Sequence, residues 1–328
     1  CRHTRLVTKD HAVRMQGVVK RFGDTLALDG VDLAVPAGAV FGLLGPNGAG
    51  KTTSVKVLTT LIRPDAGTAT IDGIDVVKNP DDVRRRIGLT GQYAAVDERL
   101  TASENLVYIG RLFYLGTAKA RLRAGELLDR FDLADSADRV VKGFSGGMRR
   151  RLDIAMSLIA NPSVLFLDEP TTGLDPRSRL GMWDVIEDLA ADGTTVLLTT
   201  QYLEEADRLA EQIVVIDQGR VIAEGTPDEL KSRTGGALLQ VSIARAENRE
   251  LAMSVLTPLC TGRVEVRDDR TFEAPITAGD RVVPSVIRAL DDAGVDVLDV
   301  VVRRPSLDDV FLVSVSYTHL RAHETRTY

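Results

Sequence analysis

The chain has 328 residues, of which 44% are hydrophobic and 27% are charged, and its formal net charge is −6. The composition is that of an ordinary globular protein, and the length predicts one full domain plus a smaller one. The acidic balance disfavours a protein that coats nucleic acid, because such a protein needs basic side chains to neutralise phosphates. The only cysteines, Cys1 and Cys260, lack a metal-like spacing and are interpreted as reduced thiols. No apolar run approaches the roughly 18 residues that cross a bilayer, so a role at a membrane requires a partner.

Both ends of the chain lack the patterns of a folded domain. Residues 1–12 are expected to be a non-native or disordered leader, because the first periodic pattern begins near Val13. Residues 315–328 show no amphipathic period and resemble the translation of a sequencing-library adapter, so a non-native tail is expected there. His319 and His323 are therefore not expected to bind a metal.

Residues 13–235 alternate between strand and helix patterns, which predicts an α/β domain built on a largely parallel sheet wrapped by helices. Strands are expected at residues 13–19, 26–35, 39–44, 68–71, 88–89, 164–167, 195–198 and 213–216. Helices are expected at residues 50–62, 177–191 and 203–208. Pro64 is expected to stop the first helix, because the residue before a proline disfavours helical geometry.

A helical subdomain is expected at about residues 93–160. Its helices are predicted from Thr101 onward and at residues 119–131 and 145–159. Thr101 and Glu104 fit a capping box at the start of the first helix. The apolar face of that helix is predicted from its spacing to consist of Leu106, Ile109, Leu112 and Phe113.

Residues 236–314 are expected to form a separate C-terminal accessory domain. Strands are predicted at residues 238–244, 263–267, 271–276 and 297–303, and helices at residues 247–259 and 281–293. The resulting order β-α-β-β-α-β is that of a small α+β, ferredoxin-like domain.

A glycine-rich segment between a predicted strand and a predicted helix is the strongest chemical signal. It consists of Gly45, Pro46, Asn47, Gly48, Ala49, Gly50, Lys51, Thr52 and Thr53. This pattern is that of a phosphate-binding loop, since glycines let backbone N–H groups converge on phosphate oxygens at a helix N-terminus. Lys51 is expected to bridge the β- and γ-phosphates of ATP, and Thr52 to bind Mg²⁺. The alternative is a tight turn without a ligand, which the flanking elements disfavour.

An apolar run at residues 164–167 ends in two carboxylates, Asp168 and Glu169. A buried strand with an acidic C-terminal tip suits the ligand crevice of a parallel sheet. Asp168 is expected to hold Mg²⁺, and Glu169 to position and polarise the attacking water. The alternative is an acidic loop after a buried strand, which the phosphate-binding pattern makes less favourable.

The segment Phe144, Ser145, Gly146, Gly147 and Met148 opens a predicted helix ahead of the acidic strand. It resembles the signature motif of ABC-type ATPases, and the resemblance covers residues 13–231. The family usually has Leu and Gln where this chain has Phe144 and Met148, but Ser145 and Gly147 are kept. The resemblance implies a P-loop NTPase cassette that forms a homodimer around two ATP molecules. Ser145, Gly146 and Gly147 would then contact the γ-phosphate held by the opposite subunit, as an exposed helix N-terminus suits an anion.

The resemblance assigns four further residues. Phe22 occupies the position of the aromatic that stacks on adenine, although a core phenylalanine is the alternative. Gln92 matches the glutamine that senses Mg²⁺ and faces the membrane partner, and Asp175 matches the aspartate that crosses the dimer interface. Gln201 stands where most of the family has a histidine contacting the γ-phosphate. An amide can donate a hydrogen bond there, but it cannot accept and return a proton as imidazole can.

The whole chain is similar to the daunorubicin/doxorubicin-resistance branch of drug-export ATPases. Residues 89–97, 145–151, 198–202 and 305–312 carry this similarity. It implies a membrane-spanning permease subunit as partner, a peripheral location on the cytoplasmic side of the cell membrane, and no nucleic acid partner. The arginine run at residues 149–151 is interpreted as a solvated helix face with contacts to partner carboxylates, rather than as a patch for an acidic partner.

Two other function classes are open. A non-transport ABC ATPase of translation or DNA maintenance would carry tandem cassettes or a long coiled coil. This chain has one phosphate-binding loop, no heptad run and an acidic balance, all of which disfavour that class. A nucleotide-binding regulator that does not hydrolyse ATP would be expected to lack the Glu169 carboxylate. An adjacent gene for a six-helix membrane protein would favour the exporter.

We expect Gln201→Ala to slow ATP hydrolysis, because it removes one hydrogen-bond donor to a charged acceptor, worth roughly 1.5–3 kcal/mol. The rate should fall roughly ten- to hundredfold if that bond strengthens in the transition state. Gln201→His should retain activity, since imidazole also donates, and should add a pH dependence near neutrality. Steady-state ATPase assays of both variants measure this, and an alanine variant as fast as the wild type would remove Gln201 from the site.

Overall fold

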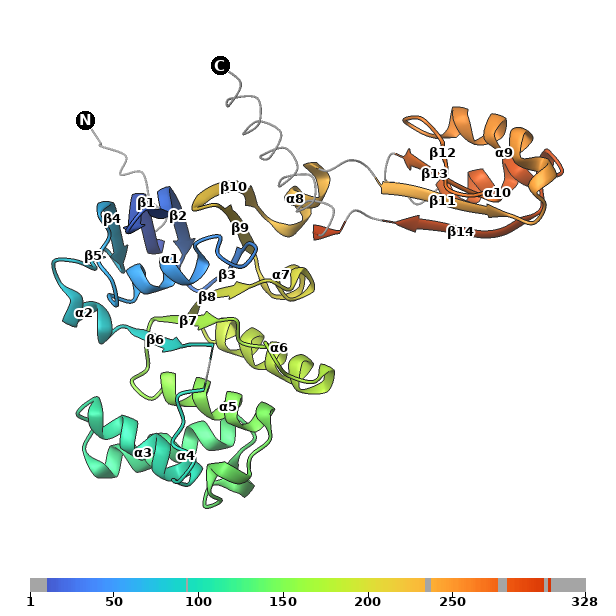
Figure 1. The fold of residues 1–328 in the computed structure, drawn as a ribbon. Helices are drawn as coiled ribbons and strands as arrows, with labels where there is room; N and C mark the ends of the chain where they lie inside the picture. Colours follow the sequence, from blue (N-terminus) through green and yellow to red (C-terminus); the bar gives the residue numbers. More distant parts are fainter. Residues whose placement is uncertain (1–10, 93, 234–236, 277–281, 304–305, 308–328) are drawn as a thin grey trace, which may run out of the picture. The chain divides into compact units, whose positions relative to one another are not determined.

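The computed structural model describes residues 11–92, 94–233, 237–276, 282–303, 306 and 307. The expected tail and all but the last two residues of the expected leader lie outside this part of the chain. The chain divides into a large unit, Cys1–Pro227, and a small unit, Asp228–Tyr328 (Figure 1).

A six-stranded sheet forms the centre of the large unit, in the order β10-β9-β3-β8-β7-β6. The strands are β3 (Val40–Leu44), β6 (Ile87–Thr90), β7 (Val164–Asp168), β8 (Thr195–Thr200), β9 (Gln212–Asp217) and β10 (Arg220–Gly225). All neighbours are parallel except β10, which pairs with β9 as an antiparallel edge. Because β3, β8 and β7 are adjacent and parallel, their C-terminal ends meet at one edge of the sheet.

Both faces of this sheet are buried, as expected for a parallel sheet covered on two sides. Alternate residues point to opposite faces, so each strand contributes to two cores. One core contains Leu165, Leu167, Val196 and Leu198 together with the helices of residues 102–191. The other core contains Phe41, Leu43, Phe166 and Leu197 together with an N-terminal sheet and the first helix.

The N-terminal strands form a second, antiparallel sheet in the order β2-β1-β4-β5. Its strands are β1 (His11–Phe22), β2 (Thr25–Pro36), β4 (Ala66–Ile71) and β5 (Ile74–Asp75). The sequence correctly predicted strands in the first three of these places, but not that they form a sheet of their own. Strand periodicity reports which residues are buried, and it does not report which strands pair.

The described residues contain nine α-helices of seven residues or more, together with the five-residue α2. They are α1 (Lys51–Leu58), α2 (Pro80–Arg84), α3 (Ala102–Leu112), α4 (Thr117–Arg130), α5 (Gly146–Ser157), α6 (Pro176–Ala191), α7 (Leu203–Leu209), α8 (Pro227–Arg233), α9 (Arg249–Leu256) and α10 (Val282–Asp292). The predicted helix at residues 50–62 is too long. It ends at Leu58 because Thr60 adopts a φ of 64° and the N–H groups of Leu61 and Ile62 turn back to the carbonyl of Lys56.

The helices α3, α4 and α5 lie together at the opposite end of the large unit from the antiparallel sheet (Figure 1). The predicted capping box of α3 is confirmed, since Glu104 N donates to Thr101 Oγ1 at 3.1 Å and Thr101 N donates to Glu104 Oε2 at 2.8 Å. The predicted apolar face is only partly right, because Leu112 and Phe113 are 57% and 41% exposed. At Gly110 the α3 backbone approaches α4 closely. The side of α3 that contains Gly110 is therefore buried, and Leu112 and Phe113 at the end of the helix are not.

The small unit contains four antiparallel strands in the order β12-β13-β11-β14, with α9 and α10. The strands are β11 (Ala237–Ile243), β12 (Glu265–Val266), β13 (Thr271–Ile276) and β14 (Val297–Arg303). This is the predicted β-α-β-β-α-β order, and the buried residues of β11 and β13 form a core of their own with Leu256 and Leu290.

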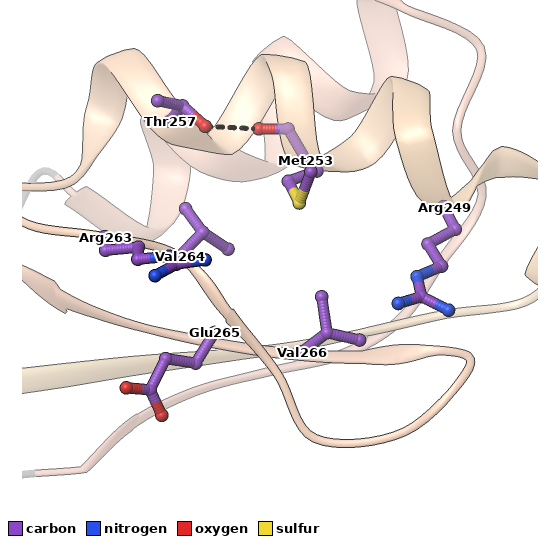
Figure 2. Close-up of a pocket in the computed structure, with 7 residues that line it drawn as sticks. All are labelled: Arg249, Met253, Thr257, Arg263, Val264, Glu265 and Val266. Carbon is purple, nitrogen blue, oxygen red and sulfur yellow. Dashed lines mark hydrogen bonds between the residues drawn. The ribbon is translucent and has the colours of Figure 1, made fainter.

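A surface hollow of about 650 Å³ lies between α9 and the β12 segment of the small unit (Figure 2). Met253, Val264 and Val266 point into the hollow, whereas Glu265 points away from it. Arg249 and Arg263 line the hollow as well and are exposed. The hollow is therefore an open surface feature lined by solvated guanidinium groups, not a site with buried polar side chains.

Candidate active site

The predicted phosphate-binding loop follows β3 and leads into α1, so Lys51 is the first residue of that helix. The acidic pair follows from β7, and the segment containing Gln201 follows β8. Because these three strands are parallel neighbours, the chain places all three segments at the carboxyl edge of the sheet, where α/β proteins bind their ligands.

The loop conformation requires glycine at two positions. A Cβ atom at Gly45 would lie 2.2 Å from the carbonyl oxygen of Ile216, closer than any side chain can approach. Gly50 has a φ of 114°, and a Cβ there would lie 2.8 Å from the carbonyl oxygen of Ala27. The glycines therefore allow the loop to pack directly against β2 and β9.

Lys51 is buried, with 4% of its surface exposed. Its Nζ donates to the carbonyl oxygens of Gly45 and Pro46 at 2.7 and 3.1 Å and lies 4.0 Å from Glu169 Oε1. Burial lowers the pKa of the Lys51 ammonium, and the charges of Glu169 and Asp168 oppose this effect. The ammonium is thus held between the loop and the acidic pair.

Asp168 is buried and accepts two hydroxyl hydrogen bonds. Thr199 Oγ1 donates to Asp168 Oδ1 at 2.5 Å, and Thr52 Oγ1 lies 3.4 and 3.3 Å from the two carboxylate oxygens. One carboxylate beside one hydroxyl is the oxygen donor set that Mg²⁺ uses when nucleotide phosphates supply further ligands. No cluster of three or more His, Cys, Asp or Glu side chains suited to a metal occurs in the described part of the chain. The donor set therefore fits Mg²⁺ only together with phosphate oxygens.

Glu169 occupies an unfavourable backbone conformation, with a φ of 50°. A left-handed conformation is costly for a residue with a side chain, and it persists only where the surroundings enforce it. The N–H of Glu169 donates to both the carbonyl oxygen and Oγ1 of Thr199, each at 3.1 Å. Thr172 Oγ1 donates to Glu169 Oε2 at 3.3 Å. Glu169 is therefore anchored beside Lys51 through its backbone by Thr199 and through its carboxylate by Thr172.

Arg150, on α5, corrects the interpretation of the arginine run as a solvated face. It is 5% exposed and donates to the carbonyl oxygens of Pro170, Gly91 and Asp168 at 2.8, 2.6 and 3.2 Å. Its Nη1 also donates to Asp153 Oδ2 at 3.2 Å. Burial lowers the pKa of the Arg150 guanidinium, and the charge of Asp153 opposes this. Arg149 and Arg151 are partly exposed, because only one of three successive helical residues faces the sheet.

Glu205, on α7, is fully buried next to the active-site edge. Its Oε1 accepts hydrogen bonds from Thr171 Oγ1 at 2.8 Å and from Trp183 Nε1 at 3.1 Å. Burial raises the pKa of this carboxyl group, and the hydrogen bonds and the charge of Arg179 only partly oppose the effect. Glu205 connects the helix that follows Gln201 to the segment that follows the acidic pair.

The signature segment opens α5. Ser145 is exposed and caps the helix, accepting a hydrogen bond from Met148 N at 3.2 Å. A Cβ atom on Gly147 would lie 2.8 Å from Ser178 Oγ, so the signature segment packs against the start of α6. Asp175 caps α6 and is exposed, and its hydrogen bonds from Ser178 lower the pKa of its carboxyl group. The two predicted dimer-facing segments thus lie side by side on one surface.

The remaining predicted site residues lie on exposed positions. Phe22, at the end of β1, is 49% exposed, and Lys20 Nζ lies 5.5 Å from its ring centroid. The ring is therefore not part of the core, which was the alternative interpretation. Gln92 and Gln201 are exposed as well, and no hydrogen bond joins either side chain to Lys51 within the part of the chain that the structure describes.

Three residues of the site were missed by the sequence reasoning, namely Thr199, Arg150 and Glu205. Each of them forms a hydrogen bond with a residue in or next to a motif segment. The two bonded residues lie 30 or more positions apart in the sequence, so the motif itself does not point to them. The only available signals were a hydroxyl at the end of a predicted strand, an arginine within a basic run, and one of two adjacent glutamates. Each of those signals is common on protein surfaces.

The phosphate-binding loop, the acidic strand end and the exposed signature helix in one domain define the ATP-binding cassette of an ABC transporter. Residues 28–172 match the protein-family model described as ABC transporter. Among solved structures, cbiO1 from Clostridium perfringens, part of the ABC transporter complex cbiONQ, superposes with a TM-score of 0.64 at 25% identity, covering 68% of this chain and 91% of that one. The ATP-binding cassette MJ0796, solved as a dimer in a post-hydrolysis state bound to ADP and Pi, superposes with a TM-score of 0.59 at 29% identity. The match covers 65% of this chain and 98% of that one.

Relatives extend the similarity to both units. Daunorubicin resistance ATP-binding protein DrrA2 of Streptomyces coeruleorubidus is 57% identical, covering 92% of this chain and 94% of its own length. Daunorubicin/doxorubicin resistance ATP-binding protein DrrA of Streptomyces peucetius is 52% identical, covering 92% and 91%. The chain therefore belongs to the daunorubicin/doxorubicin-resistance family of ABC transporter ATP-binding proteins, and it is an ATPase. The predicted family, fold class and enzymatic activity are confirmed.

The fold has no described helix that combines the length and the apolar character needed to cross a membrane.

The raised pKa of Glu205 predicts a pH-dependent contribution to stability. Between the ordinary pKa of a glutamate and its raised folded value, the folded state keeps a proton that the unfolded chain releases. The free energy of unfolding therefore falls as the pH rises through this interval, by about 1.4 kcal/mol for each unit of elevation. Glu205→Gln should lose this dependence while its amide oxygen still accepts from Thr171 and Trp183. Relative to the wild type, the variant should thus gain stability as the pH rises.

Urea unfolding followed by the fluorescence of Trp183, the single tryptophan, measures this difference between pH 4.5 and 8. Glu204→Gln, on the adjacent exposed residue, is the matched control and should follow the wild-type profile. Parallel profiles for the wild type and Glu205→Gln would show that the carboxyl group titrates normally.

Proposed function

We propose that this chain hydrolyses Mg·ATP at the carboxyl edge of its parallel sheet, as one half of a pair of cassettes that closes around two ATP molecules. One observation carries this proposal. A buried lysine of a phosphate-binding loop lies 4.0 Å from a buried glutamate, and that glutamate directly follows an aspartate in contact with the threonine hydroxyl of the loop. Lys51 would then contact the phosphate, Asp168 and Thr52 the metal, and Glu169 the water.

The phosphate end of the nucleotide would bind to the loop. Lys51 would exchange its bonds to the carbonyl oxygens of Gly45 and Pro46 for bonds to the β- and γ-phosphates, which would also favour its charged form. Thr52 and Asp168 would hold Mg²⁺, whose charge would neutralise the phosphate oxygens. Gln92 would complete this group from the segment after β6, and Phe22, with its exposed ring, would stack on the adenine.

Glu169 would orient and polarise the water that attacks the γ-phosphate. Its backbone is fixed by Thr199, and its carboxylate lies next to the ammonium that would hold the same phosphate. Positioning and electrostatic stabilisation supply most of the catalysis in phosphoryl transfer, so a fixed carboxylate suits this role. Gln201 would donate a hydrogen bond to the γ-phosphate.

A second copy would complete each site. Ser145 and Gly146 are exposed at the N-terminus of α5, where backbone N–H groups and the helix dipole favour an anion. They would contact the γ-phosphate bound by the partner's loop, and Asp175 would contact the partner chain at the adjacent start of α6. The dimeric ADP-bound cassette that this chain resembles supports a paired arrangement.

Closure and reopening of the pair would drive a separate membrane-spanning permease subunit that exports a drug or antibiotic. The resistance names of the relatives support this substrate class, and the assignment of cbiO1 to a larger transporter complex supports a separate permease. The cassette would accordingly work on the cytoplasmic face of the membrane, with Gln92 at the surface that meets the permease.

We predict that Lys51→Ala weakens ATP binding by roughly ten- to hundredfold, because it removes a charged donor worth about 1.5–3 kcal/mol. Glu169→Gln should preserve binding and lower the turnover by roughly 10²–10⁴-fold, as expected for loss of a general base. Equilibrium binding of a fluorescent ATP analogue and steady-state phosphate release measure the two effects separately. Lys56→Ala, on the exposed side of the same helix, is the matched control and should behave like the wild type.

Two outcomes would contradict the proposal. Hydrolysis by Glu169→Gln at the wild-type rate would remove the catalytic assignment of that carboxylate. Unchanged ATP affinity of Lys51→Ala would show that phosphates bind elsewhere.

A further inference from the structure

Arg150 is buried and donates hydrogen bonds to three backbone carbonyl groups. Its Nε, Nη1 and Nη2 atoms donate to the carbonyl oxygens of Pro170, Gly91 and Asp168, respectively. A planar guanidinium is the side chain that can serve three acceptors around one point, because its five N–H donors form a rigid fork. None of the three acceptors belongs to the phosphate-binding loop.

Two of the three carbonyl groups flank Glu169 in sequence. The carbonyl of Asp168 belongs to the peptide group whose N–H, on Glu169, donates to Thr199. That peptide is therefore held at its oxygen by Arg150 and at its nitrogen by Thr199. The carbonyl of Pro170 is fixed by the same guanidinium. Arg150 thus restrains the chain on both sides of the one residue that carries a positive φ in this segment.

The third carbonyl, from Gly91, joins another segment to the same point. Gly91 directly precedes Gln92, the residue proposed to meet the permease. Asp153, one helical turn after Arg150, accepts from Ala95 N at 2.9 Å and pairs with Arg150 at 3.2 Å. The segment that contains Gln92 is therefore bound to α5 on both of its sides. The signature residue Ser145 is the N-cap of the same helix.

We propose that Arg150 is a positioning residue, which holds Glu169 in its left-handed conformation and makes that conformation depend on the placement of α5 and of the Gln92 segment. This inference rests on the proposed role of Glu169 in activating water. When α5 or the Gln92 segment shifts against the sheet, the hydrogen bonds of Arg150 transmit the shift to the peptides around Glu169. Hydrolysis then proceeds only while the signature helix and the Gln92 segment are in place.

A purely structural role makes a different prediction. A buried ion pair such as Arg150 with Asp153 can serve only to satisfy the two charges within the packing of α5, and its loss then lowers stability alone. Under that view, a variant that still folds would hydrolyse ATP at the wild-type rate. Turnover and ATP affinity, measured on folded protein, therefore separate the two roles.

Arg150→Lys keeps the charge beside Asp153 but loses the fork that serves three carbonyls. We expect its kcat to fall about ten- to hundredfold, because small misplacements of a catalytic group have effects of this size. Its KM for ATP and its equilibrium affinity for an ATP analogue should stay within about twofold of the wild type, as the phosphate-binding loop is untouched. Arg151→Lys is the matched control, since Arg151 pairs with the exposed Asp132 and with no other carboxylate among the described residues, and its kcat should not change.

A double-mutant cycle with Glu169→Gln gives the second readout. Arg150→Lys should slow the single-turnover rate of the Glu169→Gln variant by less than twofold, because a residue that acts through Glu169 has no effect once that carboxylate is gone. Equal slowing in both backgrounds would overturn the positioning role. So would an Arg150→Lys variant with wild-type kcat. If Glu169→Gln itself hydrolyses ATP at the wild-type rate, the proposed function fails, and the positioning role fails with it.

If Arg150→Lys does not fold, Asp153→Asn tests the same proposal with the same kinetic measurements. Its amide oxygen still accepts from Ala95, but the charge that orients the guanidinium is lost. We expect a smaller fall in kcat, of about three- to tenfold, again without a change in ATP affinity. A folded Asp153→Asn variant with wild-type kcat would overturn the proposal.

Discussion

The backbone of Glu169 is the constraint on which the rest of the site depends. Its φ of 50° is unfavourable for a residue with a side chain, so the chain must hold it there by contacts made elsewhere. Thr199 binds its N–H from β8, and Arg150 binds the carbonyl groups on either side from α5. A sheet core, a helical subdomain and the tip of β7 are thus all required to direct one carboxylate towards Lys51. The packing of the fold holds Glu169 in this unfavourable conformation, and that conformation sets the position of its carboxylate in the site.

The order of the parallel strands explains why the site lies where it does, and the exposed signature segment is the reason for proposing a second copy. Adjacent β3, β8 and β7 bring the phosphate-binding loop, the segment with Gln201 and the acidic pair to one edge. The helix N-terminus at Ser145 is exposed and belongs to the same chain, and a pair of cassettes allows each such terminus to face the other chain's nucleotide. The same helix carries Arg150, so it connects the surface proposed to meet the partner's nucleotide with Glu169, the residue proposed to activate water.

The sequence predicted those parts of the protein that are encoded in contiguous residues. The glycine-rich loop between a strand and a helix, the capping box at Thr101 and the β-α-β-β-α-β succession of elements in the small unit all follow from local spacing and composition, and the structure contains each of them. Contacts between distant segments could not be predicted in this way. Three successive arginines in a helix give no indication that Arg150 is the buried one. The exposure of Leu112 was mispredicted for the same reason, since the close approach at Gly110 decides which side of α3 is buried. Periodicity gives the amphipathic face of an element, and tertiary packing decides which part of that face is covered.

We infer that each ATP is hydrolysed between the loop of one copy and the signature segment of the other. Mixing Lys51→Ala with Ser145→Arg, at an ATP concentration too low for Lys51→Ala to bind, measures this directly through ATPase activity. In a mixed pair, both defects fall on one composite site and the other site is intact, so random pairing should restore about a quarter of the wild-type activity. Neither variant alone should show this activity. If each site were instead built within a single chain, the mixture would stay as inactive as its components, and the account would be contradicted.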